Sequence, residues 1–145
     1  MTRVMDGPEE TETLDIPRDM LAYLIVEARA LDAQVPMLDP GDPSNPSDDG
    51  EVGVLEARSD DPTAAELAGA IDGLSDEEQI ALVALAWVGR GDFDASEWDE
   101  AKRMARERRT GPTRRYLLSI PLLGDYLEEG AAALGVNLTE DEANA

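Results

Sequence analysis

The sequence predicts an all-α protein, a compact bundle of about six helices around a buried central helix, with one long loop rich in Pro, Gly and Asp. Three observations support this fold class. Apolar residues recur at steps of three and four in several segments, which is the period of a helix. No run of strand length alternates apolar and polar residues. Residues 80–88, IALVALAWV, form an unbroken apolar run between a helix start signal and a helix stop signal.

The apolar run 80–88 identifies the central helix. A helix that is apolar on every side must be surrounded by protein or by lipid. Crossing a bilayer takes about 20 apolar residues, and this run is far shorter. We therefore expect a soluble domain built around this helix, with no membrane partner.

The chain of 145 residues has the length of one domain. We expect a disordered acidic tail at residues 1–13, a single helical domain at residues 14–135 and an acidic C-terminal tail, frayed at its end, at residues 136–145. The first residues carry acids where a signal peptide needs a basic segment followed by an apolar one. A cytoplasmic location is therefore expected.

The first helix is expected from about residue 17 to residue 33. Asp15 is placed to cap it, and Pro17 is tolerated in the first turn because its missing N–H would have no partner there. The inward face is marked by apolar residues at helical spacing: Ile16, Met20, Leu24, Ala28 and Leu31.

Residues 36–53 interrupt the helical pattern with prolines, glycines and the turn-forming steps Asp-Pro, Asn-Pro and Asp-Gly. A loop of this length in a small domain is usually functional or disordered. Its oxygen donors could bind Ca²⁺ or Mg²⁺, and the candidate ligands are Asp39, Asp42, Asp48 and Asp49. The spacing does not fit an EF-hand, and such residues also cap turns without any ion. We therefore favour no metal and no cofactor, and keep this loop as the alternative.

Two helices are expected next, the first at about residues 62–72. The central helix follows, and Ser75 with Glu78 forms its capping box, in which each side chain accepts a hydrogen bond from the backbone N–H of the other residue. Gly89 and Gly91 both fit the end of this helix, since glycine adopts the left-handed conformation without steric cost.

Three further helices are expected, at about residues 94–109, 112–119 and 121–134. The first of them has a thin apolar stripe and a basic face. In the last of them, Gly130 costs about 1 kcal/mol relative to Ala. A glycine at this internal position predicts a close approach by a neighbouring helix.

Basic residues are concentrated after the central helix. The segment 102–115 carries seven of the 12 basic residues of the chain and one of its 33 acidic residues, although the net charge is −21. We predict an electropositive docking face for a protein partner, formed by Lys102, Arg103, Arg106, Arg109, Arg114 and Arg115. The alternative is that these side chains pair with the protein's own acids. Nucleic acid is a disfavoured partner because the remaining negative charge repels phosphates.

Several blocks of sequence are distinctive when they are read together: SNPSDDG at 44–50, DDPT at 60–63, EL at 66–67, DEEQ at 76–79, LVAL at 82–85, GRGD at 89–92, YLL at 116–118 and PLLGDYLEEG at 121–130. With these blocks the chain resembles an uncharacterised bacterial family that is known only as a domain of unknown function. The resemblance extends from about residue 14 to residue 135. It implies a short, acidic, all-α protein, and it brings no activity, cofactor or catalytic residue with it.

The composition restricts the chemistry of the protein. The chain has no Cys and no His, which removes disulfides, thiolate metal sites and the commonest general base. We therefore favour a non-catalytic interaction or regulatory module that docks through the basic face, and we name no catalytic residue. A divalent-metal-binding protein or metal-dependent enzyme that uses the aspartate-rich loop is the alternative. An acidic mimic of nucleic acid is a further alternative.

Overall fold

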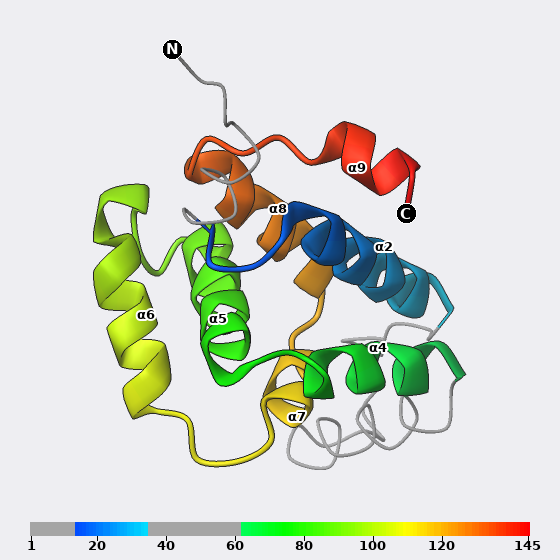
Figure 1. The fold of residues 1–145 in the computed structure, drawn as a ribbon, viewed down its shortest axis with the longest axis horizontal. Coiled ribbons are helices and arrows are strands. Elements are labelled where there is room, and N and C mark those ends of the chain that lie inside the picture. The colour runs from blue at the N-terminus through cyan, green and yellow to red at the C-terminus, as the bar shows by residue number, and fades with distance from the viewer. Residues whose placement is uncertain (1–13, 35–61) are drawn as a thin grey trace, which may run out of the picture.

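The structure is a computed structural model that describes residues 14–34 and 62–145. These residues form helices and no strand (Figure 1), which confirms the all-α prediction for them. The elements are α2 (Arg18–Gln34), α4 (Pro62–Asp72), α5 (Asp76–Arg90), the 3₁₀ helix η1 (Ala95–Glu97), α6 (Trp98–Glu107), α7 (Thr113–Leu118), α8 (Leu123–Ala133) and α9 (Thr139–Ala143). The tail 1–13 and the loop 36–53, with the metal candidates Asp39, Asp42, Asp48 and Asp49, lie outside the described residues.

Contacts between helices define the arrangement. α5 contacts α6, α7 and α8, while α2 contacts α4, α8 and α9. Figure 1 shows α6 on one side of α5 and α8 on the other, with α4 and α7 together at the end of the molecule away from α9. In the described part of the chain, no helix combines the length and the apolar character that crossing a membrane requires.

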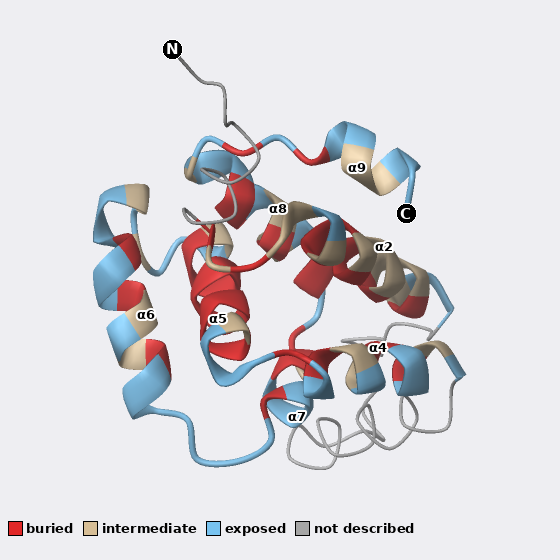
Figure 2. Cartoon of the chain, viewed as in Figure 1, coloured by how far each residue is buried: buried red, intermediate tan, exposed pale blue. Residues whose placement is uncertain are grey.

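Helix α5 carries the apolar run 80–88, and every residue of the run is buried (Figure 2). Trp87, at the end of the run, is only 8% exposed. The predicted capping box is confirmed: Ser75 Oγ accepts from the Glu78 N–H at 3.1 Å, and Glu78 Oε1 accepts from the Ser75 N–H at 2.9 Å. Gly91 ends the helix with a φ of +98°, which a side chain would disfavour.

Helices α5 and α8 approach each other at two glycines. A Cβ atom at Gly130 would lie 2.3 Å from the carbonyl oxygen of Leu85, and one at Gly89 would lie 1.8 Å from that of Tyr126. The close approach predicted at Gly130 is therefore confirmed. Gly89 has a different role from the expected one, because it lies inside α5 and allows contact with α8, while Gly91 ends the helix.

The start of α2 differs from the expectation. Asp15 has a φ of +63°, and its carboxylate pairs with Lys102 of α6 instead of capping α2. The helix begins at Arg18, and the carbonyl of Pro17 accepts the Leu21 N–H at 2.9 Å. The Asp15 carboxylate, which we expected to cap α2, thus forms a long-range ion pair with Lys102 instead.

The end of the chain also differs from the expectation of a frayed segment. Val136 and Leu138 are buried, and α9 follows them. Arg18 Nε lies 2.7 Å from Asp141 Oδ2, which connects α9 to α2. Apolar burial and ion pairing therefore dock this acidic segment on the helices before it.

Candidate functional site

The basic residues of the segment 102–115 belong to α6, α7 and the turn between them. Trp98, Ala101 and Ala105 of α6 are buried, and α6 contacts α5. Because the apolar stripe of α6 faces α5, the charged residues of this helix lie on its remaining faces. The function of this region depends on which of these charges are available to a partner.

Most of the predicted docking residues pair with carboxylates of the same chain. The pairs are Lys102 with Asp15, Arg103 with Glu100 and Glu107, Arg106 with Glu77 at 2.7 Å, Arg109 with Asp76 at 3.1 Å, and Arg114 with Asp72 at 3.0 Å. The last three pairs join the α6–α7 region to the start of α5 or the end of α4. Exposed pairs of this kind contribute about 0–1 kcal/mol each, so they connect helices without adding much stability.

Arg108 and Arg115 differ from the other basic residues of the segment. Both side chains are exposed. Neither takes part in an ion pair or a hydrogen bond through its side chain within residues 14–34 and 62–145. Of the six predicted docking residues, Arg115 is thus the one whose charge stays unpaired in this part of the chain. Arg108, which the sequence reasoning left out of that set, joins it.

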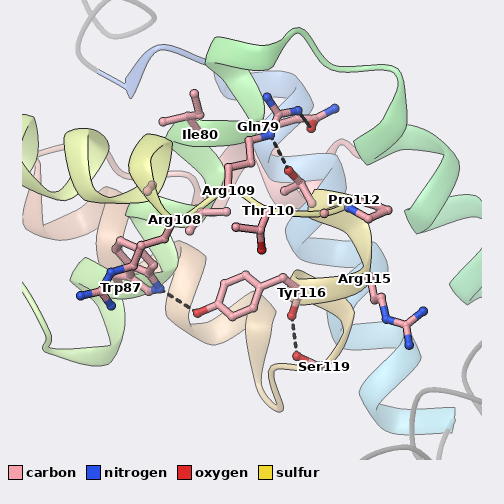
Figure 3. Close-up of a pocket in the computed structure, with 14 residues that line it drawn as sticks. Gln79, Ile80, Trp87, Arg108, Arg109, Thr110, Pro112, Arg115, Tyr116 and Ser119 are labelled. Atoms are coloured by element: carbon pink, nitrogen blue, oxygen red, sulfur yellow. Dashed lines mark hydrogen bonds between the residues drawn. The ribbon is translucent and has the colours of Figure 1, made fainter.

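Both of these arginines line a cavity of about 460 Å³ (Figure 3). Its apolar wall consists of Ile80, Val83 and Trp87 of α5 with Ala105 of α6. The turn between α6 and α7, residues 110–112, and the first part of α7 complete the lining. Cavities of this volume lie within the range that holds small ligands.

The wall nearest α7 is fixed by a hydrogen bond between two aromatic residues. Trp87 Nε1 donates to the Tyr116 hydroxyl oxygen at 2.8 Å, which joins α5 to α7 (Figure 3). Arg90, at the end of α5, donates to Asp92 at 2.6 Å. The pKa of Arg90 is raised chiefly by this hydrogen bond and further by the neighbouring Tyr116 oxygen, against the opposing effect of burial.

The opposite wall is held by Gln79, a buried polar residue. Its amide nitrogen donates to the carbonyl oxygens of Ile71 at 3.0 Å and Leu74 at 3.2 Å. Its amide oxygen accepts from Arg109 Nη2 at 2.7 Å, and Arg109 Nε donates to Thr113 Oγ1 at 3.2 Å. The guanidinium of Arg109 is therefore fixed in the wall of the cavity, because it binds Gln79 and Thr113 in addition to its ion pair with Asp76.

The charge of the lining is unusual for this protein. Among the described residues, the lining contains three arginines and no acidic residue, although acids outnumber basic residues by 33 to 12 in the chain. An apolar wall with positive charges at its edge suits an anion that carries an apolar group. The lining supplies hydrogen-bond donors and positive charge, which are the groups that bind such an anion.

Carboxylates gather elsewhere, around Arg29 of α2. Asp125 lies 3.0 Å and Glu142 lies 2.9 Å from its guanidinium, and Glu128 also pairs with it. Within the described ranges, no group of three or more acidic side chains is arranged to hold a metal ion. The guanidinium occupies the centre of this cluster, which therefore holds helices α2, α8 and α9 together.

Sequence reasoning missed the cavity because its walls come from separate helices. On α6, Lys102, Arg106 and Arg109 share one face by their spacing, and Arg108 falls outside that face. The available signal was the turn at Gly111 and Pro112, which stops α6 and lets the chain reverse. The direction that α7 takes after this turn depends on packing. The contact between Trp87 and Tyr116 could therefore not be predicted from the sequence.

A comparison with protein families identifies a family for this chain. Residues 64–136 match the model of a family described as a protein of unknown function (DUF3775). The chain belongs to the DUF3775 family. The DUF3775 match begins in α4 and ends after α8, so it contains every residue that lines the cavity. The resemblance expected from residue 14 is thus shown from residue 64. No curated protein and no solved structure matches the chain.

Proposed function

We propose that the protein is a non-catalytic interaction module that docks an anionic partner protein on the side where α6 turns into α7. The observation that carries this proposal is the cavity whose lining, in the part of the chain that the structure describes, contains three arginines and no acid. Arg108 and Arg115 have no ion pair or side-chain hydrogen bond among the described residues. A partner carboxylate can therefore bind them without displacing an existing contact.

The paired arginines are less suited to this task. A partner that binds Arg106 or Arg114 must displace Glu77 or Asp72, and the exchange of one exposed ion pair for another yields little free energy. The proposed docking face is therefore narrower than the whole basic segment. It is centred on the cavity, with Arg108 and Arg115 as its charged contacts.

The net charge of the chain decides the range over which the docking face acts. At a net charge of −21, the molecule repels other anions at long range. At physiological ionic strength the Debye length is about 8 Å, so the nearest arginines dominate once the partner is in contact. Two unpaired arginines offer few phosphate contacts, which favours a protein partner over nucleic acid. The proposal includes the cytoplasmic location expected from the sequence.

A capture experiment with two matched double variants tests this function. The variant R108Q/R115Q removes the unpaired charges, and R103Q/R106Q removes two exposed, paired charges from the same segment outside the cavity. The tagged proteins are used to capture partners from a lysate of the source cells, after circular dichroism has shown that both variants fold. We expect an acidic protein that the wild type and R103Q/R106Q retain and that R108Q/R115Q loses. Capture that is equal for all three proteins contradicts the proposal.

A further inference from the structure

We infer that the partner presents an extended acidic segment, which inserts one bulky apolar side chain into the cavity and places carboxylates on Arg108 and Arg115. This inference rests on the proposed function and specifies the chemistry of the partner. Three properties of the cavity lead to it: the apolar wall, the positions of the two arginines and the hydroxyl of Tyr116.

The apolar wall indicates what enters the cavity. Ile80, Val83 and Ala105 contribute aliphatic surface, and Trp87 contributes an aromatic face. These residues are largely covered by the rest of the fold, so an added apolar group extends a well-packed region. A volume of about 460 Å³ is near the lower end of the range for small-ligand sites. It accommodates one large apolar side chain together with the backbone that carries it.

The two unpaired arginines lie on different sides of this wall. In Figure 3, Arg108 lies on the Trp87 side of Tyr116, and Arg115 lies on the other side of that ring. A small anion gains most when several cations converge on it, and these two do not converge. A chain in extended conformation advances about 3.3 Å per residue and can place acids on both sides of a central residue. The separation of the arginines therefore favours a peptide segment over a small free anion.

Tyr116 provides a polar contact between the two arginines. Its hydroxyl oxygen accepts the Trp87 indole N–H at 2.8 Å, and the residue as a whole is 39% exposed. The hydroxyl proton has no acceptor within the described part of the chain. A backbone carbonyl of a bound segment would supply one, because an extended chain presents such groups along its whole length.

Synthetic peptides test the inference directly. The first peptide carries a central leucine flanked on each side by several acidic residues. The second has serine at the centre, and the third has glutamine in place of every acid. Binding is followed by fluorescence polarisation of labelled peptides and by the emission of Trp87 in a Trp98→Phe background. This background removes the other tryptophan, whose indole N–H is buried and has no hydrogen-bond partner among the described residues.

The expected pattern follows from the two kinds of contact. Replacing the central leucine by serine weakens binding roughly tenfold or more, because one buried aliphatic side chain is lost. The R108Q/R115Q variant weakens binding of the leucine peptide roughly tenfold, while R103Q/R106Q leaves it within about twofold. The glutamine peptide binds more weakly than the acidic peptide by a similar factor. Emission from Trp87 changes with the leucine peptide.

Several outcomes overturn the inference and remain distinct from a failure of the proposed function. Equal binding of the leucine and serine peptides, with dependence on Arg108 and Arg115, rejects insertion into the cavity but retains acidic docking. Displacement of the peptide by an equal concentration of citrate identifies a small-anion site instead. Self-association that R108Q/R115Q abolishes identifies a second copy as the occupant. If none of the three peptides binds at millimolar concentration, the inferred extended acidic segment is rejected. The proposed function is then decided by the capture experiment alone.

Discussion

At the scale of single residues, two glycines set the distance between α5 and α8. The backbone of Leu85 lies against Gly130, and the backbone of Tyr126 lies against Gly89. A backbone carbonyl cannot move aside as a flexible side chain can, so any added Cβ atom must push the helices apart. The contact fixes α8 against the same helix that provides the apolar wall of the cavity.

The first prediction concerns Gly130. The substitution Gly130→Ala is expected to lower the free energy of unfolding by about 1–3 kcal/mol, because it overpacks a contact between two backbones. Urea denaturation followed by circular dichroism measures the change. Gly69→Ala is the matched control, since Gly69 lies inside α4 and no described atom lies within 4 Å of a Cβ atom built there. This control is expected to raise stability by about 0.5–1 kcal/mol. Equal behaviour of the two variants would show that α5 and α8 do not touch here.

The second prediction concerns the start of α5. Ser75→Ala removes the hydroxyl that accepts the Glu78 N–H, and we expect a loss of about 1 kcal/mol in unfolding free energy. Ser96→Ala provides the control, because Ser96 is an exposed residue of η1 and is expected to change stability by less than about 0.5 kcal/mol. Chemical denaturation of both variants measures the difference. A Ser75→Ala protein as stable as Ser96→Ala would contradict the role of the capping box.

At the scale of elements, α9 shows how an acidic segment docks on an acidic protein. Glu142 approaches Arg29 at 2.9 Å, yet Glu128 binds the same guanidinium. Burial raises the pKa of the Glu142 carboxyl most, repulsion by Glu128 raises it further, and Arg29 opposes both effects. One arginine therefore does not fully compensate the carboxylates around it, and the contact between α9 and the rest of the fold depends on pH.

The third prediction follows from the sign of this pKa shift. Because the folded-state pKa of Glu142 lies above the ordinary value of 4.5, the folded protein binds this proton more tightly than the unfolded chain. The stabilisation of the folded state by this proton is fully present at a pH below the ordinary pKa of 4.5. It is lost as the pH rises through the folded-state pKa. The thermal midpoint of the wild type should therefore rise relative to that of Glu142→Gln as the pH falls from neutral to about 5. A difference between the two midpoints that does not change over this range would contradict the shift.

At the scale of the whole molecule, charge is segregated instead of evenly spread. The net charge is −21, but most of the basic residues lie within residues 102–115. Several of them bridge helices by ion pairs with the chain's own acids. Ion pairs with the chain's own acids involve most of the basic residues of the segment 102–115. Within the described ranges, Arg108 and Arg115 at the cavity take part in no ion pair. Within the described ranges, unpaired positive charge thereby remains at the cavity of a protein that is acidic in composition.

The fourth prediction concerns salt. Self-repulsion of a chain with a net charge of −21 destabilises the compact state, and salt screens it. The exposed ion pairs lose strength in salt too, but each contributes little. We therefore expect the thermal midpoint to rise as sodium chloride increases from about 10 mM to about 1 M, over which the Debye length falls from about 30 Å to about 3 Å. Calorimetry measures it, and a falling midpoint would show that the bridges dominate.

The sequence by itself determined the helices from α2 to α8 among the described residues and several of their ends, but not α9. Apolar periodicity, the Ser75 capping box and the break after Gly91 are local signals, because they depend on neighbours within about one turn. The close approach at Gly130 could also be predicted, since a glycine inside a helix needs a reason in packing. Membership of the DUF3775 family supports the resemblance that the sequence blocks indicated.

Only the tertiary structure decided which charges are free and where the cavity lies. The ion pair of Arg106 with Glu77 joins residues 29 positions apart, and that of Lys102 with Asp15 joins residues 87 positions apart. The bond between Trp87 and Tyr116 likewise depends on the path of the chain after Gly111. Helical spacing groups charges on one face of a helix, but it carries no information about which carboxylate a neighbouring helix brings to that face. For this physical reason, the sequence could reveal a basic segment but not the role of each residue in it. Only the packing of the helices shows that Arg108 and Arg115 are unpaired among the described residues, while other arginines of the segment connect helices.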